Sequence, residues 1–335
     1  MSKVVVIVGP TASGKSALAI EVARQLNGAI VSADSMQIYR GLDVGTAKET
    51  GKVREEIPHF MIDVVDRNQE FSVSQFKDMA SLAIEKIEGM GKLPIVVGGT
   101  GLYIEALLYP FSFGNAVKDE TIRKMLTEEC ELNGSDELYS KLKSIDSESA
   151  AKLHPNDTKR IIRALEIFYL TGKTKTQSKD QIKQCAYDIV FVGLECDRAR
   201  LYQKIDKRVD EMFGAGLLDE IKSLEKYDDR FSWQSMQAIG YKEFAEYYNF
   251  NKFIENDDKE NIISQSKICP NKSVSIENCD LSEMELIKEK IKKDSRNYAK
   301  RQLTWFRRYE NLKWFDCFEE ITLAIEYIKN QIQKI

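Results

Sequence analysis

The segment GPTASGKS, residues 9–16, fits the pattern G-x-x-x-x-G-K-[ST], which a phosphate-binding loop requires. In such a loop, backbone N–H groups point into a concavity that binds a phosphate chain. The lysine ammonium reaches the terminal phosphates, and the serine hydroxyl holds Mg²⁺. The motif therefore predicts a diphosphate or nucleotide site formed by Gly9, Pro10, Thr11, Ala12, Ser13, Gly14, Lys15 and Ser16, with Ser16 as the metal ligand.

The elements around this loop are those that the motif needs. The apolar, β-branched run Val4–Val8 is typical of a strand that is buried on both faces. After Ser16, apolar residues recur at helical spacing. A phosphate would then lie at the N-terminus of a helix, where the backbone provides positive potential.

Apolar strands and helices alternate farther along the chain. We expect one strand to end at Ser32, another over 93–97 and a third within YDIVFVGLECDR, residues 187–198. This alternation predicts an α/β fold with a P-loop NTPase-like parallel sheet. Ligands of such sheets collect at the carboxyl ends of the strands. The polar residues just beyond those ends, Asp34, Gln37 and Thr100, are therefore expected to face the same crevice as the loop.

Two segments interrupt this pattern. Residues 113–185 are helical and charged, which indicates a helical insertion domain between core segments 1–112 and 186–335. Residues 251–283 are rich in Asn, Ser, Asp and Lys and show little periodicity. They are interpreted as a flexible loop inserted into the core.

Composition excludes several classes of protein. With 335 residues and 43% hydrophobic content, the chain can bury a large core. No apolar run approaches the ~20 residues of a membrane span. The six cysteines form no C-x-x-C pair and only two histidines are present, so a zinc site is disfavoured. These features indicate a reduced, cytoplasmic protein.

The net charge of −4 conceals a basic segment. Residues 288–308 contain nine Lys and Arg against two acidic residues, a local charge of +7. On a helix, Lys293, Arg296 and Lys300 lie near one stripe. Because phosphate binding depends on a local patch, this segment favours a nucleic-acid partner. A solvated amphipathic helix is the alternative.

The sequence shows no clear second strand that ends in an aspartate. A motor ATPase or GTPase carries another apolar strand that ends in Asp, whereas strands 93–97 and 188–194 end in Gly98-Gly99 and Gly193-Leu194. The nearest candidate, Asp63, lies in a short ambiguous run. We interpret the site as the pocket of a small-molecule transferase or kinase.

Seven segments together resemble a known family. In chain order they are GPTASGKS, SADSMQIYRGLDVGTAK, PHFMIDVVD, VVGGTGLYI, HPNDTKRIIRALEIF, AIGYKE and RNYAKRQLTWFRR. They are similar to the signature blocks of the bacterial tRNA dimethylallyltransferases over most of the chain. The resemblance implies that the loop and Mg²⁺ bind dimethylallyl diphosphate, and that the prenyl group passes to N6 of the adenosine 3′ of a tRNA anticodon.

The resemblance also implies catalytic roles. An exocyclic adenine amine is a poor nucleophile and needs a base, for which Asp34 is at the matching position. An N-cap or a water-mediated Mg²⁺ ligand is the alternative for Asp34. Thr100 would contact the substrate nucleotide. Arg208 would join Lys15 in stabilising the departing diphosphate, although alone it would be a helix-surface charge.

The implied tRNA contacts come from several segments of the chain. Asp34, Ser35, Met36 and Gln37 would contact the flipped adenine, and Arg123 would fill the gap that it leaves. The stem would be held by Lys159, Arg160, Ile161, Ile162, Arg163, Lys293, Arg296 and Lys300. Residues 238–243 would line the side of the site that faces tRNA. We expect the protein to be a monomer.

Two other functions stay open at this point. A transferase acting on free adenine nucleotides would not need the basic segment, and a P-loop kinase would need a phosphoryl-acceptor pocket that is not evident.

Overall fold

A computed structural model describes residues 3–49, 51–109, 119–174, 185–225, 232–245 and 281–333. The chain divides into two compact units. The larger comprises 1–108 and 187–335, and the smaller comprises 109–186.

The larger unit is built on a six-stranded, all-parallel sheet with the order β3-β2-β4-β1-β5-β6. The predicted α/β fold with a parallel P-loop-type sheet is confirmed. Val8 pairs with both Gly98 and Gly193, so β1, β4 and β5 end at the same level. The short edge strands β3 and β6 were not predicted. The strands are β1 (Lys3–Val8), β2 (Gly28–Ser32), β3 (His59–Phe60), β4 (Leu93–Gly98), β5 (Asp188–Glu195) and β6 (Lys313–Asp316).

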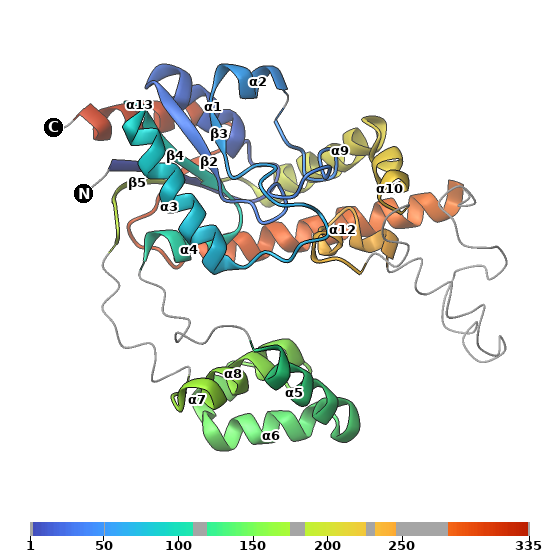
Figure 1. Ribbon diagram of the computed structural model, residues 1–335. Coiled ribbons are helices and arrows are strands. Elements are labelled where there is room, and N and C mark those ends of the chain that lie inside the picture. The colour runs from blue at the N-terminus through green and yellow to red at the C-terminus, as the bar shows by residue number, and fades with distance from the viewer. Residues whose placement is uncertain are drawn as a thin grey trace. The chain divides into compact units, whose positions relative to one another are not determined.

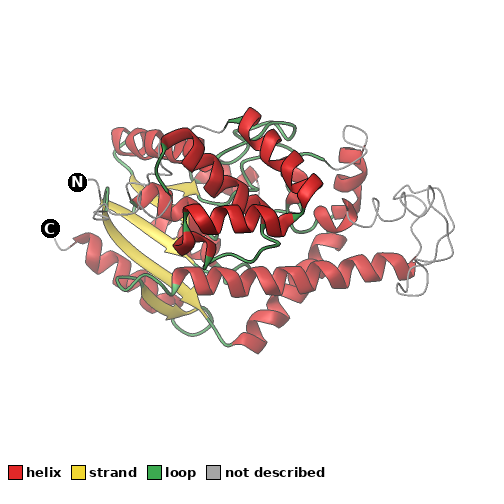
Figure 2. Ribbon diagram, turned by 90° about the horizontal axis from the view of Figure 1, so that it is seen from below, coloured by secondary structure: helices red, strands yellow, loops and turns green. Residues whose placement is uncertain are grey.

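Helices cover both faces of this sheet (Figures 1 and 2). On one face, α1 (Lys15–Gln25) and α13 (Ile321–Gln333) share an apolar core with alternate residues of β1 and β5. On the other, α3 (Val73–Gly89) packs on α4 (Gly101–Leu108), with Phe76 and Tyr103 stacked 4.0 Å apart. The remaining elements of this unit are α2 (Gly51–Glu56), α9 (Arg198–Gly214), α10 (Leu217–Glu225), the 3₁₀ helix η2 (Gln234–Gln237) and α12 (Leu281–Phe306).

The basic segment 288–308 lies largely in α12, which confirms its predicted helical structure. Helix α12 contacts α9 and α4, and Figure 2 shows it as a long helix beside the sheet. Residues 251–280 of the expected loop lie outside the described residues. Its last three residues, 281–283, were wrongly predicted as loop, because they form the first turn of α12.

The smaller unit is helical over its described residues. It contains α5 (Glu120–Asn133), α6 (Ser135–Ile145), α7 (Ser147–Ala150) and α8 (Thr158–Thr171). Its apolar core includes Leu126, Leu138, Leu142, Ile161 and Leu165, which come from three helices. This unit therefore has a hydrophobic core of its own.

Candidate active site

The phosphate-binding motif forms the connection from β1 to α1. Gly14 precedes α1 with φ +86°, a left-handed conformation that a glycine adopts without steric cost. The Lys15 ammonium folds back over the loop and donates to the Pro10 carbonyl at 3.3 Å. Thr11, Lys15 and Ser16 line a cavity of about 70 Å³. The loop therefore has the local form that the motif predicts.

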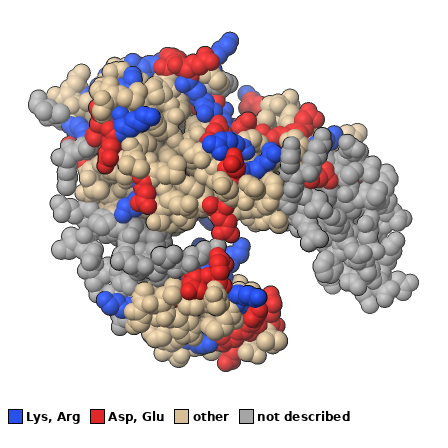
Figure 3. Space-filling model, viewed as in Figure 1, with Lys and Arg blue, Asp and Glu red and all other residues tan. Residues whose placement is uncertain are grey.

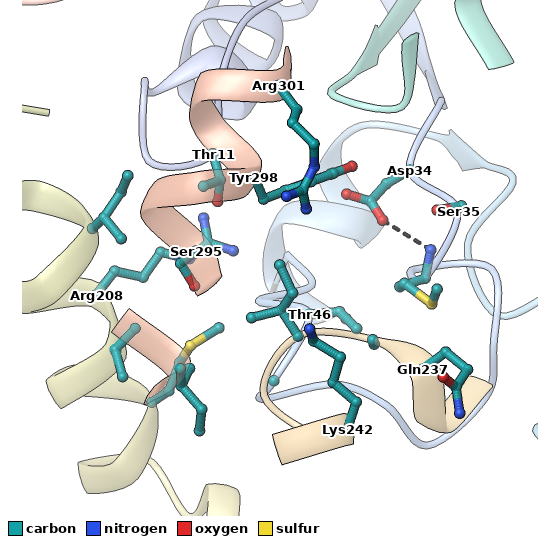
Figure 4. A pocket seen from close by; sticks show the side chains of 18 residues that line it. Thr11, Asp34, Ser35, Thr46, Arg208, Gln237, Lys242, Ser295, Tyr298 and Arg301 are labelled. Atoms are coloured by element: carbon teal, nitrogen blue, oxygen red, sulfur yellow. Dashed lines mark hydrogen bonds between the residues drawn. The ribbon is translucent and has the colours of Figure 1, made fainter. Parts of the chain in front are cut away.

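A second cavity, of about 270 Å³, adjoins the first (Figure 4). Its walls come from α9, α12, the segment 237–242, the turn after β2, Thr11 of the phosphate loop and the segment 45–46. We call the 70 Å³ space the inner cavity and the 270 Å³ space the outer cavity. Five residues line both: Thr11, Asp34, Thr46, Arg208 and Tyr298. Asp34 and Arg208 therefore lie where a group in the inner cavity would meet a group in the outer one.

Asp34 follows β2 and is fixed through one of its carboxylate oxygens. Oδ1 accepts hydrogen bonds from the N–H of Met36 at 2.9 Å and of Gln37 at 3.4 Å. No donor to Oδ2 is found among the described residues. The side chain thus closes a turn with one oxygen and keeps the other for a ligand. Such an arrangement suits a base that must hold one orientation.

Two cations lie near Asp34: Lys15 lines the inner cavity, and Arg208 lines both cavities. Burial, followed by the nearby Arg208 guanidinium, lowers the pKa of Lys15 to about 8, against the opposing effect of Asp34. Burial likewise lowers the pKa of Arg208, again against Asp34. Within the described chain, neither cation has a carboxylate within ion-pair distance. Both side chains are partly buried, and a cation that is withdrawn from water without an ion-pair partner is costly, so this arrangement is suited to an anionic ligand.

Thr100 lies behind Asp34 and lines neither cavity. Its Oγ1 accepts from the N–H of Ser35 at 3.1 Å and lies 3.3 Å from the Ser35 hydroxyl. Through these contacts Thr100 helps to hold the Asp34 turn, and its expected contact with the substrate nucleotide stays a prediction. Ser35 and Met36 line the outer cavity.

Gln37 lines the inner cavity rather than the outer one. Its amide is held at both ends, because Oε1 accepts from the Ser32 hydroxyl at 2.9 Å and Nε2 donates to the Thr46 carbonyl at 3.2 Å. In this structure Gln37 connects the Asp34 turn to the Thr46 segment.

Some of the residues of the smaller unit that were predicted to contact tRNA lie on its surface, and others lie in its core. Arg123 and Arg163 both pair with the fully buried Glu166 carboxylate, at 2.9 and 2.6 Å. Ile161 is fully buried, so its predicted contact with tRNA is wrong for the side chain, which packs in the helical core. Ile162 is partly buried, and Lys159 and Arg160 are exposed.

The three basic residues predicted to form one stripe on α12 differ in their surroundings. Lys293 and Lys300 are exposed, and neither has an ion-pair partner in the described part of the chain. Arg296 instead pairs with Asp206 of α9 at 2.5 Å. This ion pair joins α12 to α9, and the predicted contact of Arg296 with tRNA stays a prediction. On the face shown in Figure 3, basic and acidic side chains are interspersed over the larger unit.

Sequence reasoning missed three residues of α12 that reach the site. Tyr298 and Arg301 line the outer cavity near Asp34 (Figure 4), and Gln302 lines the inner one. Burial, and then the Asp34 charge, raises the pKa of Tyr298 to about 12, so its hydroxyl stays protonated. A signal was present, because Tyr298 and Gln302 continue the buried stripe of Ile291 at helical spacing. Polar groups on a buried stripe indicate specific partners.

The donor set around the loop fits Mg²⁺ held largely by phosphate. Among the described residues, no cluster of three or more His, Cys, Asp or Glu could hold a metal ion. Mg²⁺ commonly takes only one or two protein oxygens beside phosphate and water, which Ser16 can supply. Asp63 is engaged by Lys48 at 2.6 Å and Arg54 at 2.8 Å.

No described helix combines the length and the hydrophobicity that a bilayer span requires.

Comparisons with known proteins extend over nearly the whole chain. Residues 37–309 match the family described as IPP transferase, and residues 2–63 match that described as isopentenyl transferase. The tRNA dimethylallyltransferase of Anoxybacillus flavithermus is 42% identical, with 95% of this chain and 91% of the relative aligned. That of Bacillus subtilis is 41% identical, with 96% and 93% aligned.

Two solved structures are also similar. The tRNA isopentenylpyrophosphate transferase of Bacillus halodurans gives a TM-score of 0.66 at 38% identity, with 100% of this chain and 98% of that chain covered. A eukaryotic dimethylallyltransferase whose structures show it acting on tRNA gives 0.76 at 29% identity, covering 99% and 78%.

Proposed function

Because this chain belongs to the IPP transferase family, we propose that it transfers a dimethylallyl group from dimethylallyl diphosphate to tRNA. The acceptor is N6 of the adenosine 3′ of the anticodon, and diphosphate is released. The observation that carries this proposal is that two partly buried cations lie near Asp34: Lys15 lines the inner cavity, and Arg208 lines both cavities together with Asp34.

The positions of these groups match the two halves of the reaction. N6 of the adenosine forms a bond to C1 of the donor while the C1–O bond breaks, and that electron pair leaves with the diphosphate. Asp34 takes the N6 proton through Oδ2 as the amine becomes positive. Lys15 and Arg208 stabilise the negative charge that develops on the leaving oxygen. Bound Mg²⁺, held by Ser16 and the phosphates, would neutralise part of the diphosphate charge.

The outer cavity offers surfaces for both organic groups. Apolar side chains of α9 and α12, Ile205, Val209, Met212 and Ile291, form one part of its wall. These can cover the hydrocarbon of the prenyl group and keep water from an allylic centre. Ser35, Lys242 and Arg301 supply polar groups for an adenosine.

A transfer assay tests this function. The protein is incubated with unmodified tRNA, Mg²⁺ and labelled dimethylallyl diphosphate, and label in tRNA is measured. A tRNA with guanosine 3′ of the anticodon is the matched control, because it lacks the N6 amine. Transfer to free adenine nucleotides alone, or tRNA-stimulated ATP turnover without prenylation, would overturn the proposal.

The lowered pKa of Lys15 predicts a pH dependence for diphosphate binding. The anion favours the protonated lysine, which is the main form in the free protein below pH 8. Affinity for magnesium pyrophosphate should therefore be highest below pH 8. Above pH 8 it should fall by up to about tenfold per pH unit, until the raised pKa of the bound state is reached. Calorimetry over pH 6.5–9.5 measures this fall.

Lys15→Arg is the control for that experiment, since an arginine stays charged throughout the range. The variant corrects for the titration of pyrophosphate itself. Identical pH profiles for the parent protein and this variant would show that Lys15 does not carry the effect.

Helix α12 provides a separate prediction about tRNA. The double change Lys293→Glu and Lys300→Glu should raise the tRNA KM and leave the donor KM unchanged. The magnitude of the log–log salt slope should fall by roughly 0.7–0.9 for each phosphate that the variant no longer neutralises. Filter binding at several salt concentrations measures the slope.

Lys52→Glu with Lys86→Glu makes the same charge change at exposed sites on α2 and α3. This control variant should retain the parent slope. Equal salt slopes for the parent and both double variants would show that the α12 lysines do not contact tRNA phosphates.

A further inference from the structure

Gln302 bridges two of the chain segments that form the phosphate site. Its Oε1 accepts the Thr11 N–H of the loop at 2.8 Å. Its Nε2 donates to the Gly99 carbonyl, directly after β4, at 2.9 Å. The side chain is 5% exposed and comes from α12, about 290 residues away in sequence from the loop that it contacts. One amide thus joins α12, the loop and the end of β4.

Two glycines after β4 face side chains of α12 at this bridge. A Cβ atom at Gly99 would collide with Nε2 of Gln302, and one at Gly101 would collide with the indole of Trp305. A side chain at position 99 would displace the Gln302 amide from its bridge, and one at position 101 would push against the rigid indole, so the two glycines leave room for these groups of α12. The bridge therefore belongs to a close contact between α12 and the end of β4, at the wall of the inner cavity.

The bridge has a consequence for the loop. The Thr11 N–H donates to the glutamine, which fixes the peptide group at the start of the loop. Thr11 itself lines both cavities. A loop released from Gln302 can rotate its peptide groups and lose the arrangement that suits a diphosphate.

We infer that Gln302 is a positioning residue for the diphosphate loop, so that the loop geometry depends on helix α12. This rests on the proposed function only in naming the ligand as a diphosphate. Gln302 touches the loop backbone rather than reacting atoms, and it acts through Thr11 and Gly99. The same helix carries Lys293 and Lys300, so the helix proposed to contact tRNA also supports the donor site.

The test is pyrophosphate binding to the full-length protein without tRNA. Gln302→Met keeps the length of the side chain but can form neither bond. Its dissociation constant for magnesium pyrophosphate should rise about tenfold, the usual effect of removing a buried hydrogen bond together with its geometry. In transfer assays the donor KM should rise similarly, while tRNA affinity stays within twofold of the parent value.

Gln203→Met is the matched control, because Gln203 is an exposed amide on α9. Gln302→Glu is the second variant should methionine prevent folding. It retains an acceptor for Thr11, loses the donor to Gly99 and adds negative charge beside the loop, so it should weaken pyrophosphate binding at least as much.

Parent-like pyrophosphate affinity in a folded Gln302 variant would overturn this inference and leave the proposed function intact. Equal weakening of pyrophosphate and tRNA binding would also overturn it, by showing a general structural defect. Failure of the parent protein itself to bind pyrophosphate would instead contradict the proposed function.

Discussion

Asp34→Asn should lower kcat for prenyl transfer by about 10²–10⁴-fold, the usual contribution of a positioned base. Asparagine keeps an Oδ1 that can accept from Met36, so the turn after β2 is retained. The amide that replaces Oδ2 cannot take a proton from N6. Affinity for pyrophosphate should not fall, because the substitution removes a negative charge near Lys15. Single-turnover kinetics with saturating tRNA measures the chemical step.

The matched control is Asp197→Asn. Asp197 caps α9 by accepting from the N–H groups of Ala199 and Arg200, so the substitution tests the same change in a comparable turn. Asp197 lines neither the inner nor the outer cavity, and its variant should transfer the prenyl group at the parent rate. A near-normal rate for Asp34→Asn would show that Asp34 is structural and that another group is the base.

Arg208→Met should lower kcat by about 10²–10³-fold, because a cation aimed at developing charge acts mainly in the transition state. The substitution should also raise the thermal stability of the free protein. Arg208 is a partly buried cation whose pKa is lowered by desolvation, and it has no ion-pair partner in the described residues. Methionine removes that desolvation cost and fills similar space. Loss of activity with a gain in stability is a signature of a functional site.

Arg296→Met provides the contrast on stability. Arg296 is paired with Asp206 across the α12–α9 contact, so its removal leaves a carboxylate without its partner and should lower the unfolding temperature. Scanning calorimetry without ligand compares the two variants. A lower unfolding temperature for Arg208→Met, together with normal transfer, would show that Arg208 stabilises the fold and takes no part in catalysis.

Local pattern was sufficient to predict the elements that carry the loop. Val4–Val8 and the strand ending at Ser32 are buried runs next to a phosphate-binding motif, and their ends determine where Asp34 lies. The edge strands β3 and β6 were missed because they have only two and four residues. Such short strands have no periodicity of their own and depend on tertiary pairing.

The predictions for charged residues show where sequence pattern is insufficient. Lys293, Arg296 and Lys300 are equivalent by helical spacing, yet only Arg296 faces an acid on α9. Arg123 was predicted from the resemblance, but the Glu166 that holds it is 43 residues away in sequence. Partners of this kind are set by packing between distant segments. Gln302 was missed for the same reason, since nothing near it in sequence indicates the loop that it bridges.

A single-turnover reaction with enzyme in excess tests most directly whether the loop serves a prenyl diphosphate rather than ATP. It contains tRNA, labelled dimethylallyl diphosphate, ATP and Mg²⁺, and pyrophosphate, ADP and prenylated adenosine are measured together. We expect one pyrophosphate released for each adenosine modified, with ATP unchanged and no reaction on tRNA that has guanosine at the target position. ADP formed in response to tRNA, with no label transferred, would contradict the proposed function.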